Sequence, residues 1–178
     1  MNKSKIILFS GKSGHGKDFI SNIFKEQLEV ANKKVLIVHY ADLLKFICKT
    51  FFEWDGNKDE SGRTLLQYVG TDVIRNTDPN YWVDFIKGII HMFPNTWDYI
   101  LVPDTRFYNE INVLKDDEQL NVFTVRINRL NYSSTLTKEQ QNHISETELD
   151  DFMFDYYVIN DKKEHLIEQI QNIIEKID

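Results

Sequence analysis

One eleven-residue stretch constrains the fold of this chain more than any other. FSGKSGHGKDF, residues 9–19, holds three glycines and two lysines. Before it lies the short apolar run Ile6–Phe9, which is typical of a buried parallel strand. After it, Asp18–Val30 has its apolar side chains on one helical face. A strand, a glycine-rich turn and a helix in this order indicate one unit of an α/β fold.

The same alternation continues along the chain. The expected strands are Ile6–Phe9, Val35–Tyr40, Tyr99–Val102, Asn121–Ile127 and Tyr156–Ile159. The expected helices are Asp18–Val30, Ala41–Phe52, Arg63–Arg75, Tyr81–Met92, Phe107–Lys115 and His165–Ile174. We therefore predict a single α/β domain over residues 1–178, in which a five-stranded, mostly parallel sheet is flanked by helices.

Parallel α/β sheets bind their ligands beyond the carboxyl ends of the strands. This rule places Gly11–Asp18, His39–Lys45, Pro103–Glu110 and Asn128–His143 along one edge. The last of these segments is polar and has no clear periodicity, so we expect a mobile loop there.

Bulk properties exclude several classes of protein. The net charge of −7 argues against a binder of duplex DNA, but a few converging cations suffice for a small phosphorylated ligand. The single cysteine, Cys48, excludes an internal disulfide framework and is expected in the core rather than as a nucleophile. We see no signal peptide and no apolar run long enough to span a membrane, so we expect a cytoplasmic protein that does not bind membranes.

Residues Gly11–Asp18 fit the pattern G-x-x-x-x-G-K in its required context of a preceding strand and a following helix. The glycines let backbone N–H groups curl around phosphate oxygens, and the start of the helix adds partial positive charge. Lys17 would reach the outer phosphates. Asp18 stands where Ser or Thr usually ligates magnesium, and it could hold the ion through water or cap the helix. The alternative is a glycine-rich turn without a ligand, which the strand and helix context makes the weaker interpretation.

Arginine is scarce in this chain, with five residues against sixteen lysines, and its planar guanidinium binds phosphate in bidentate fashion. Asp104 and Arg106 follow the expected strand Tyr99–Val102. Asp104 could hold magnesium or cap the next helix, and Arg106 could bind a transferring phosphate or pair with a surface acid. The sequence leaves both pairs of alternatives open.

Further candidates occur between residues 41 and 150. A straight helix would put Arg63 and Arg75 on roughly similar faces, although each of them, taken singly, is expected on a solvated helix surface. In HISETELD, residues 143–150, we expect Ser145 and Glu148 to form a capping box, which leaves His143 and its helical neighbour Glu146 free for another role. Trp82 is more typical of a core than of a base-stacking surface.

Together these segments resemble a known family. SGKSGHGKD, ADLLK, LLQYVGTDVIRNTDPNYWV, PDTRFYNE and HISETELDDFMFDYYVIND occur in the order expected for the deoxynucleoside monophosphate kinases known from bacteriophages, within the P-loop kinases. The resemblance covers nearly the whole chain. Animal-type phosphomevalonate kinases are similar too, through LFSGKSGHGKDF, LLK, PDTR and FDYYVIND, but their match is thinner across residues 65–82 and at HISE.

The resemblance implies a role for each candidate. ATP would lie on Gly11, Lys12, Ser13, Gly14, His15, Gly16, Lys17 and Asp18, and Mg²⁺ would be held by Asp18 and Asp104. The acceptor would contact Lys45, Arg63, Arg75, Asp78, Trp82, His143 and Glu146. Lys17, Asp104, Arg106 and Arg129 would be catalytic, with Arg129 part of a short lid over residues 128–143. Pro103 before the acid and the few arginines in the lid depart from the family pattern.

The expected function is therefore an ATP-dependent kinase that transfers the γ-phosphoryl group to a deoxynucleoside monophosphate and yields the diphosphate. Two alternatives stay open: a kinase of a non-nucleotide phosphate such as phosphomevalonate, and a nucleotide-binding regulator without turnover. The sequence selects neither the base nor the sugar, and it leaves a homodimer open.

Overall fold

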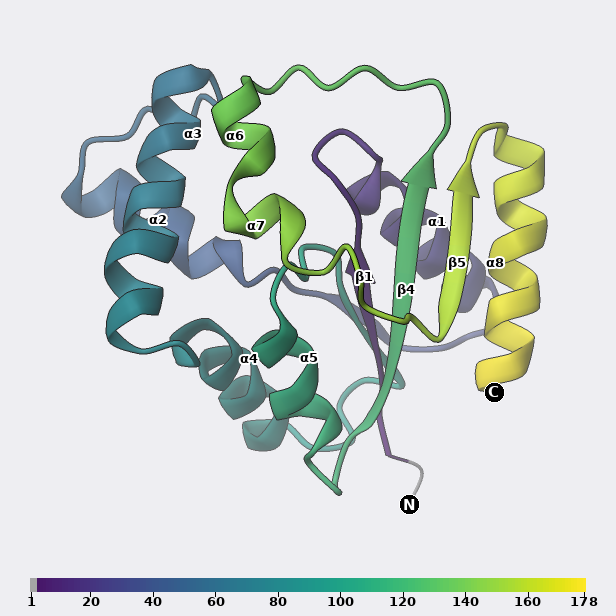
Figure 1. The fold of residues 1–178 in the computed structure, drawn as a ribbon. Coiled ribbons are helices and arrows are strands. Elements are labelled where there is room, and N and C mark those ends of the chain that lie inside the picture. Colours follow the sequence, from purple (N-terminus) through teal and green to yellow (C-terminus); the bar gives the residue numbers. More distant parts are fainter. Residues whose placement is uncertain (1–2) are drawn as a thin grey trace.

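A computed structural model of the chain describes residues 3–178 and contains one five-stranded sheet (Figure 1). The strands are β1 (Lys5–Ser10), β2 (Val35–Ile37), β3 (Tyr99–Val102), β4 (Asn121–Arg129) and β5 (Tyr156–Asn160), in the spatial order β2-β3-β1-β4-β5. Every neighbouring pair is parallel. The predicted α/β sandwich is thus confirmed, and its sheet is parallel throughout.

Helices cover both faces of the sheet (Figure 1). On one face, α1 (Lys17–Val30) and α8 (Lys163–Ile177) pack against Ile7 and Phe9 of β1. On the other, α4 (Tyr81–Met92) and α5 (Tyr108–Lys115) pack against Ile6 and Leu8. Successive side chains of a strand point to opposite faces, so a strand covered on both sides reads as a continuous apolar run.

A third group of helices stands beside the sheet, at the left of Figure 1. It comprises α2 (Ala41–Phe51), α3 (Glu60–Gln67) and the π-helix η1 (Tyr68–Arg75). Cys48, Trp54 and Val69 form their own small core, in which Cys48 is fully buried, as predicted. In the part of the chain that the structure describes, no helix is both long and apolar enough to cross a membrane.

Two predicted elements differ from the observed ones for identifiable reasons. The expected helix Arg63–Arg75 is an α-helix that continues as a π-helix from Tyr68. Within this π-helix, the Gly70 carbonyl accepts a hydrogen bond from the indole N–H of Trp82 at 3.0 Å. The strand β2 ends at Ile37 rather than at Tyr40, because Tyr40 already begins the turn into α2.

The segment predicted as a mobile loop, Asn128–His143, is partly ordered. Asn128 and Arg129 extend β4, and α6 (Lys138–Asn142) begins at a capping box in which Thr137 and Gln140 bond each other's backbone N–H. Only residues 130–137 form an irregular connection, which crosses from the end of β4 to α6 in Figure 1. The irregular backbone is therefore shorter than the segment predicted to be a mobile loop.

The short helix α7 (Ile144–Thr147) starts differently from the prediction. Its cap is His143, whose Nδ1 accepts from the Ser145 N–H at 3.2 Å, so the predicted capping box of Ser145 and Glu148 is wrong. Glu148 instead accepts from the backbone N–H of Tyr108 at the start of α5, at 2.8 Å. The remaining predicted elements lie within a few residues of the observed ones.

Candidate active site

The carboxyl end of the sheet opens into one cavity of about 550 Å³. Its walls come from the glycine-rich segment Gly11–Asp18 after β1, called the phosphate loop below, from α2, α3 and η1, from the turn after β3, and from α6 and α7. Six cations line it: Lys17, Lys45, Lys58, Arg63, Arg75 and Arg106. Four carboxylates, from Asp18, Asp104, Glu110 and Glu146, lie among them. A cation-rich cavity in a chain of net charge −7 is suited to an anionic ligand.

The phosphate loop depends on glycine at positions where a side chain would collide. Gly14 has φ +80°, and a Cβ there would lie 2.0 Å from the Tyr132 hydroxyl. Gly16 has φ +90°, and a Cβ there would lie 2.4 Å from Nδ2 of Asn160, which donates to the His15 carbonyl at 2.8 Å. Gly16 is also the residue that precedes α1, so the backbone N–H groups of the first turn face the cavity end of the helix.

Lys17 folds back into this loop. Its Nζ donates to the carbonyl oxygens of Gly11 at 2.7 Å and of Lys12 at 3.1 Å, and the residue is 9% exposed. Burial, followed by the nearby Arg106 guanidinium, lowers the pKa of Lys17 to about 7. A buried ammonium whose partners are carbonyl oxygens gains strongly from an arriving phosphate, because the phosphate supplies the missing negative charge.

Asp18, the residue that departs from the usual pattern, does not cap α1; that place belongs to Gly16. Its Oδ1 lies 2.8 Å from Nε2 of His39, which follows β2. This hydrogen bond lowers the pKa of Asp18 and raises the pKa of His39. Asp18 therefore stands as a carboxylate at the rim of the cavity.

Asp104 caps a helix, but not the one that follows it in sequence. Its two oxygens accept the backbone N–H groups of Tyr40 at 3.0 Å and Ala41 at 2.9 Å, at the start of α2. Asp18 and Asp104 both line the cavity, whereas residues 3–178 hold no cluster of three or more metal-ligating side chains. One or two carboxylates completed by phosphate and water oxygens is the usual Mg²⁺ site of phosphoryl-transfer enzymes, so these residues fit the ion.

Arg106 points from the turn after β3 toward α7. Its Nη1 donates to the Ser145 carbonyl at 2.9 Å and pairs with Oε1 of Glu146, whose side chain is 6% exposed. Burial opposes the ionisation of Glu146, but the Arg106 charge and the hydrogen bonds from Arg106 and Ser13 lower the pKa of this carboxyl overall. The acid that pairs with Arg106 is thus inside the cavity and not at the surface.

Arg75 enters the cavity from η1 in a tightly held orientation. Its Nη2 bonds Oε1 of Glu110 at 2.6 Å, and its Nη1 donates to Oδ1 of Asn109 at 3.1 Å and to the Pro79 carbonyl at 3.2 Å. The guanidinium also lies 3.7 Å from the centre of the Phe107 ring. Its Nε is buried, and among the described residues it has no partner.

Six predicted site residues do not line the cavity: Gly11, Lys12, His15, Asp78, Arg129 and His143. Asp78 is exposed and accepts from the N–H of Asn80, and His143 caps α7. Arg129, at the end of β4, approaches the phosphate loop from outside: it donates to the Gly14 carbonyl at 3.1 Å and lies over the Tyr132 ring. The side chain of Lys12, inside the loop sequence, turns toward α7 and bonds the Glu146 carbonyl and Asp150.

Several cavity residues escaped prediction, above all Glu110, Gln67 and Thr71. A signal for two of them was present in the sequence. Residues 63, 67, 71 and 75 recur at intervals of four, and all of them line the cavity, so the side of this segment that carries the two arginines also carries Gln67 and Thr71.

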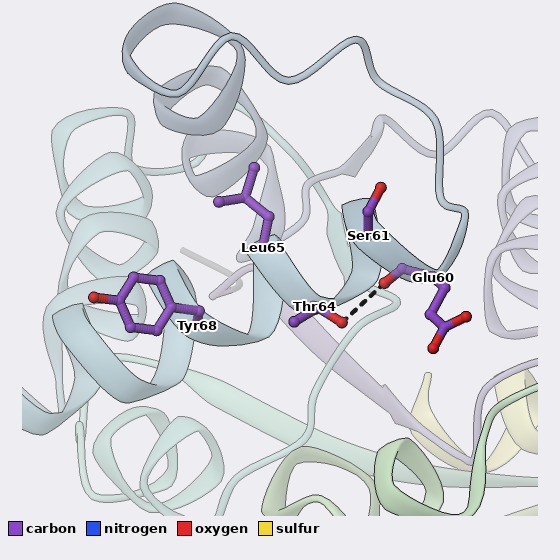
Figure 2. Close-up of a pocket in the computed structure, with 5 residues that line it drawn as sticks. All are labelled: Glu60, Ser61, Thr64, Leu65 and Tyr68. Atoms are coloured by element: carbon purple, nitrogen blue, oxygen red, sulfur yellow. Dashed lines mark hydrogen bonds between the residues drawn. The ribbon is translucent and has the colours of Figure 1, made fainter.

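A separate hollow lies on the outer side of α3 (Figure 2). Its lining residues are Glu60, Ser61, Thr64, Leu65 and Tyr68, and the Thr64 hydroxyl in it donates to the Glu60 carbonyl at 2.9 Å. It contains no predicted site residue and no cation, so it lacks the anion-binding features of the larger cavity.

A parallel sheet with a glycine-rich phosphate loop at the end of β1 and a cation-lined cavity beside it defines a P-loop kinase fold. Solved structures agree. APS kinase CysC of Mycobacterium tuberculosis matches with a TM-score of 0.56, at 13% identity over 98% of this chain and 97% of that one. Shikimate kinase of Aquifex aeolicus matches with a TM-score of 0.52, at 14% identity over 97% of this chain and 95% of that one. At these identities the likeness shows the fold alone.

The sequence comparison is more specific. Residues 27–174 match the family model described as deoxynucleotide monophosphate kinase, and the chain belongs to that family. The deoxynucleotide monophosphate kinase of phage T4 is 31% identical over 117 residues, which are 64% of this chain and 45% of that protein, so the match spans less than half of its length. A protein of Acanthamoeba polyphaga mimivirus whose name assigns it to the same family is 27% identical, over 88% of this chain and 89% of its own length.

Proposed function

We propose that this chain is an ATP-dependent kinase that phosphorylates a deoxynucleoside monophosphate to the diphosphate. The observation that carries the proposal is the continuity of one cavity, which joins Lys17 of the phosphate loop with the guanidinium groups of Arg63, Arg75 and Arg106. A donor phosphate at the loop and an acceptor phosphate among the arginines would share this space. Membership of the deoxynucleotide monophosphate kinase family supports the same activity.

The residues beside the arginines of the cavity favour a nucleotide as the acceptor over a simpler phosphate compound. Leu66, Gln67, Thr71 and Trp82 line the cavity beside the arginines. The indole N–H of Trp82 is bonded to the Gly70 carbonyl, so Trp82 offers the cavity an apolar surface. Gln67 and Thr71 add amide and hydroxyl groups at the same wall. Apolar surface combined with a few polar groups suits a heterocyclic base.

The chemistry needs little beyond positioning and neutralisation of charge. The attacking oxygen belongs to a phosphate that is already anionic, so no strong general base is required. Lys17 and Arg106 would stabilise the negative charge that passes between the two phosphates. When bound, Mg²⁺ supplies further neutralisation at the phosphate oxygens, with Asp18 and Asp104 as the carboxylates placed to hold it.

Water must be kept away from the donor phosphate, since it would otherwise hydrolyse ATP. Residues 130–137 lead from β4 to α6. Leu136, near the end of this connection, and Gln140, in α6, both line the cavity. We therefore assign the lid role to residues 130–142, with Arg129 at its base on the phosphate loop.

An acceptor panel tests the proposal. The purified chain is incubated with ATP and Mg²⁺ and with each ribo- and deoxyribonucleoside monophosphate or phosphomevalonate, and ADP release is measured. We expect the highest turnover with one or more deoxynucleoside monophosphates, because a site with buried polar groups rejects acceptors that leave those groups unpaired. A preference for phosphomevalonate would show that the acceptor is a non-nucleotide phosphate and would leave the assignment of ATP as the donor unchanged. ATP binding without ADP release on any acceptor would identify a regulator.

A further inference from the structure

Glu110, in the first turn of α5, is a carboxylate without an assigned role. It is 2% exposed, and each of its oxygens is engaged. Oε1 accepts from Nη2 of Arg75 at 2.6 Å. Oε2 accepts from the backbone N–H groups of Arg106 at 2.7 Å and Phe107 at 3.1 Å. One buried carboxylate thus connects the side chain of one cavity arginine with the backbone of another.

We propose that Glu110 is a positioning residue for the phosphate acceptor: it holds the Arg75 guanidinium toward the cavity and fixes the turn that carries Arg106. The inference rests on the proposed function, since it concerns the acceptor of that reaction. A guanidinium binds phosphate through N–H groups in a rigid fork, so its orientation determines how well it binds. A free arginine side chain loses rotamer entropy when it binds. An arginine already held by Glu110 has lost much of this entropy before the acceptor arrives.

The simpler interpretation is that Glu110 only caps α5. An acidic residue at this place in a helix commonly accepts the N–H groups that precede the helix. That role needs Oε2 alone, and it is ordinarily filled at the surface. Burial of Glu110 disfavours its charged form and raises the pKa of the carboxyl to about 7. A cap does not require this burial, whereas a carboxylate that must reach Arg75 in the wall of the cavity does.

The first test compares Glu110→Gln with the matched control Glu148→Gln. Glu148 also accepts a backbone N–H at the start of α5, that of Tyr108, but its carboxylate contacts no arginine among the described residues. For each variant the KM of acceptor and of ATP, kcat, the acceptor dissociation constant and the melting temperature are measured. We expect Glu110→Gln to raise the acceptor KM and dissociation constant about tenfold or more, with the KM of ATP within about twofold. Glu148→Gln should leave the KM values, kcat and the acceptor dissociation constant within about twofold.

A lowered melting temperature with an unchanged acceptor KM would show a cap only and overturn the proposal. An equal rise of the acceptor KM in Glu148→Gln would do the same. If Glu110→Gln does not fold, Glu110→Asp keeps the charge but withdraws it by one methylene, and it should show the same selective rise in acceptor KM. An acceptor KM that stays at the wild-type value in a folded Glu110→Asp would count against the role.

A double-variant cycle tests the mechanism. If Glu110 acts through Arg75, then the loss of acceptor affinity in Glu110→Gln combined with Arg75→Ala should be clearly smaller than the sum of the two single losses; any loss beyond that of Arg75→Ala alone would come from the turn that carries Arg106. Independent, additive losses would contradict it. The proposed function fails separately: wild-type protein without turnover on any nucleotide refutes that function, whereas the ratio of variant to wild-type acceptor affinity tests Glu110. Wild-type protein that binds no phosphate acceptor overturns both.

Discussion

The Glu146 carboxylate on α7 accepts a hydrogen bond from the backbone N–H of Ser13 in the phosphate loop at 2.8 Å, across 133 positions of sequence. The other oxygen of this carboxylate pairs with Arg106. The loop that would hold ATP is therefore connected to Arg106 through one side chain. A substitution in the phosphate loop should therefore alter the position of Arg106, and a substitution of Arg106 should alter the loop.

Arg106→Lys should lower turnover by about tenfold or more, because lysine keeps the charge but loses the planar fork. A single ammonium cannot replace the contacts to Ser145 and Glu146 and also bind a phosphate in bidentate fashion. Steady-state ADP release measures the effect. Arg126→Lys is the control, since Arg126 bonds Ser10 and Asp150 and does not line the cavity. Nearly normal turnover in Arg106→Lys would reduce Arg106 to a structural ion pair.

Lys17→Ala should leave the fold intact but slow phosphoryl transfer at least about a hundredfold, a loss of about 3 kcal/mol of charge stabilisation. The fold should tolerate the change, because burial disfavours the Lys17 charge, as its lowered pKa of about 7 indicates. Turnover and melting temperature are measured together. Lys25→Ala, on the exposed side of the same helix, should change neither. A Lys17→Ala protein with normal turnover would refute the phosphate-loop assignment.

Residues 130–137 should exchange their amide hydrogens rapidly in the free protein and become protected only when ATP and acceptor bind together. Their irregular backbone has no ladder of hydrogen bonds, whereas residues 124–129 belong to β4 and should be protected in both states. Hydrogen exchange followed by mass spectrometry distinguishes the two segments. Equal protection of residues 130–137 with and without ligands would exclude a lid.

The pH dependence of stability should reveal an anchor between α4 and the turn after α5. The hydrogen bond from Lys87 at 2.9 Å, together with those from Gln119 and His91, holds the pKa of Asp117 well below its usual range. A carboxyl whose folded pKa is depressed stabilises the fold above its unfolded pKa of about 4, and this contribution is lost as the pH falls further. Urea unfolding should show wild type more stable than Asp117→Asn above about pH 5, with the difference shrinking below about pH 4. The neighbouring exposed Asp116→Asn should show no such change.

Much of the fold could be predicted because its signals are local. All five strands were predicted, and the clearest are the two buried on both faces, because such a strand is apolar throughout, as Ile6–Phe9 and Tyr99–Val102 are. The exceptions are places where distant contacts choose the backbone conformation. The π-helix from Tyr68 to Arg75 packs Gly70 against Leu44 of α2, and its Gly70 carbonyl receives the Trp82 indole; neither partner is visible in the local pattern.

The residues of the site also fall into those that the local sequence predicts and those that only distant contacts reveal. The phosphate loop was predictable, because its glycines, Lys17 and the flanking strand and helix are contiguous in sequence. Glu110 was not, because its significance lies in bonds to Arg75 and to the backbone of Arg106 that only the folded chain creates. His143 was expected near the acceptor, yet the structure uses it to cap α7, since an unpaired N–H at the helix start lies within its reach.

The sequence by itself determined the α/β class, the position of the phosphate loop and the set of cations available to bind phosphate. These properties follow from apolar periodicity and from residue types that act within a few positions of one another. Only the tertiary structure decided which charges face the same cavity and which are held in place. Asp104 capping α2, Glu146 joining Ser13 to Arg106 and Glu110 holding Arg75 all depend on side chains meeting across distant segments. Such contacts arise because the parallel sheet gathers the ends of its strands at one edge.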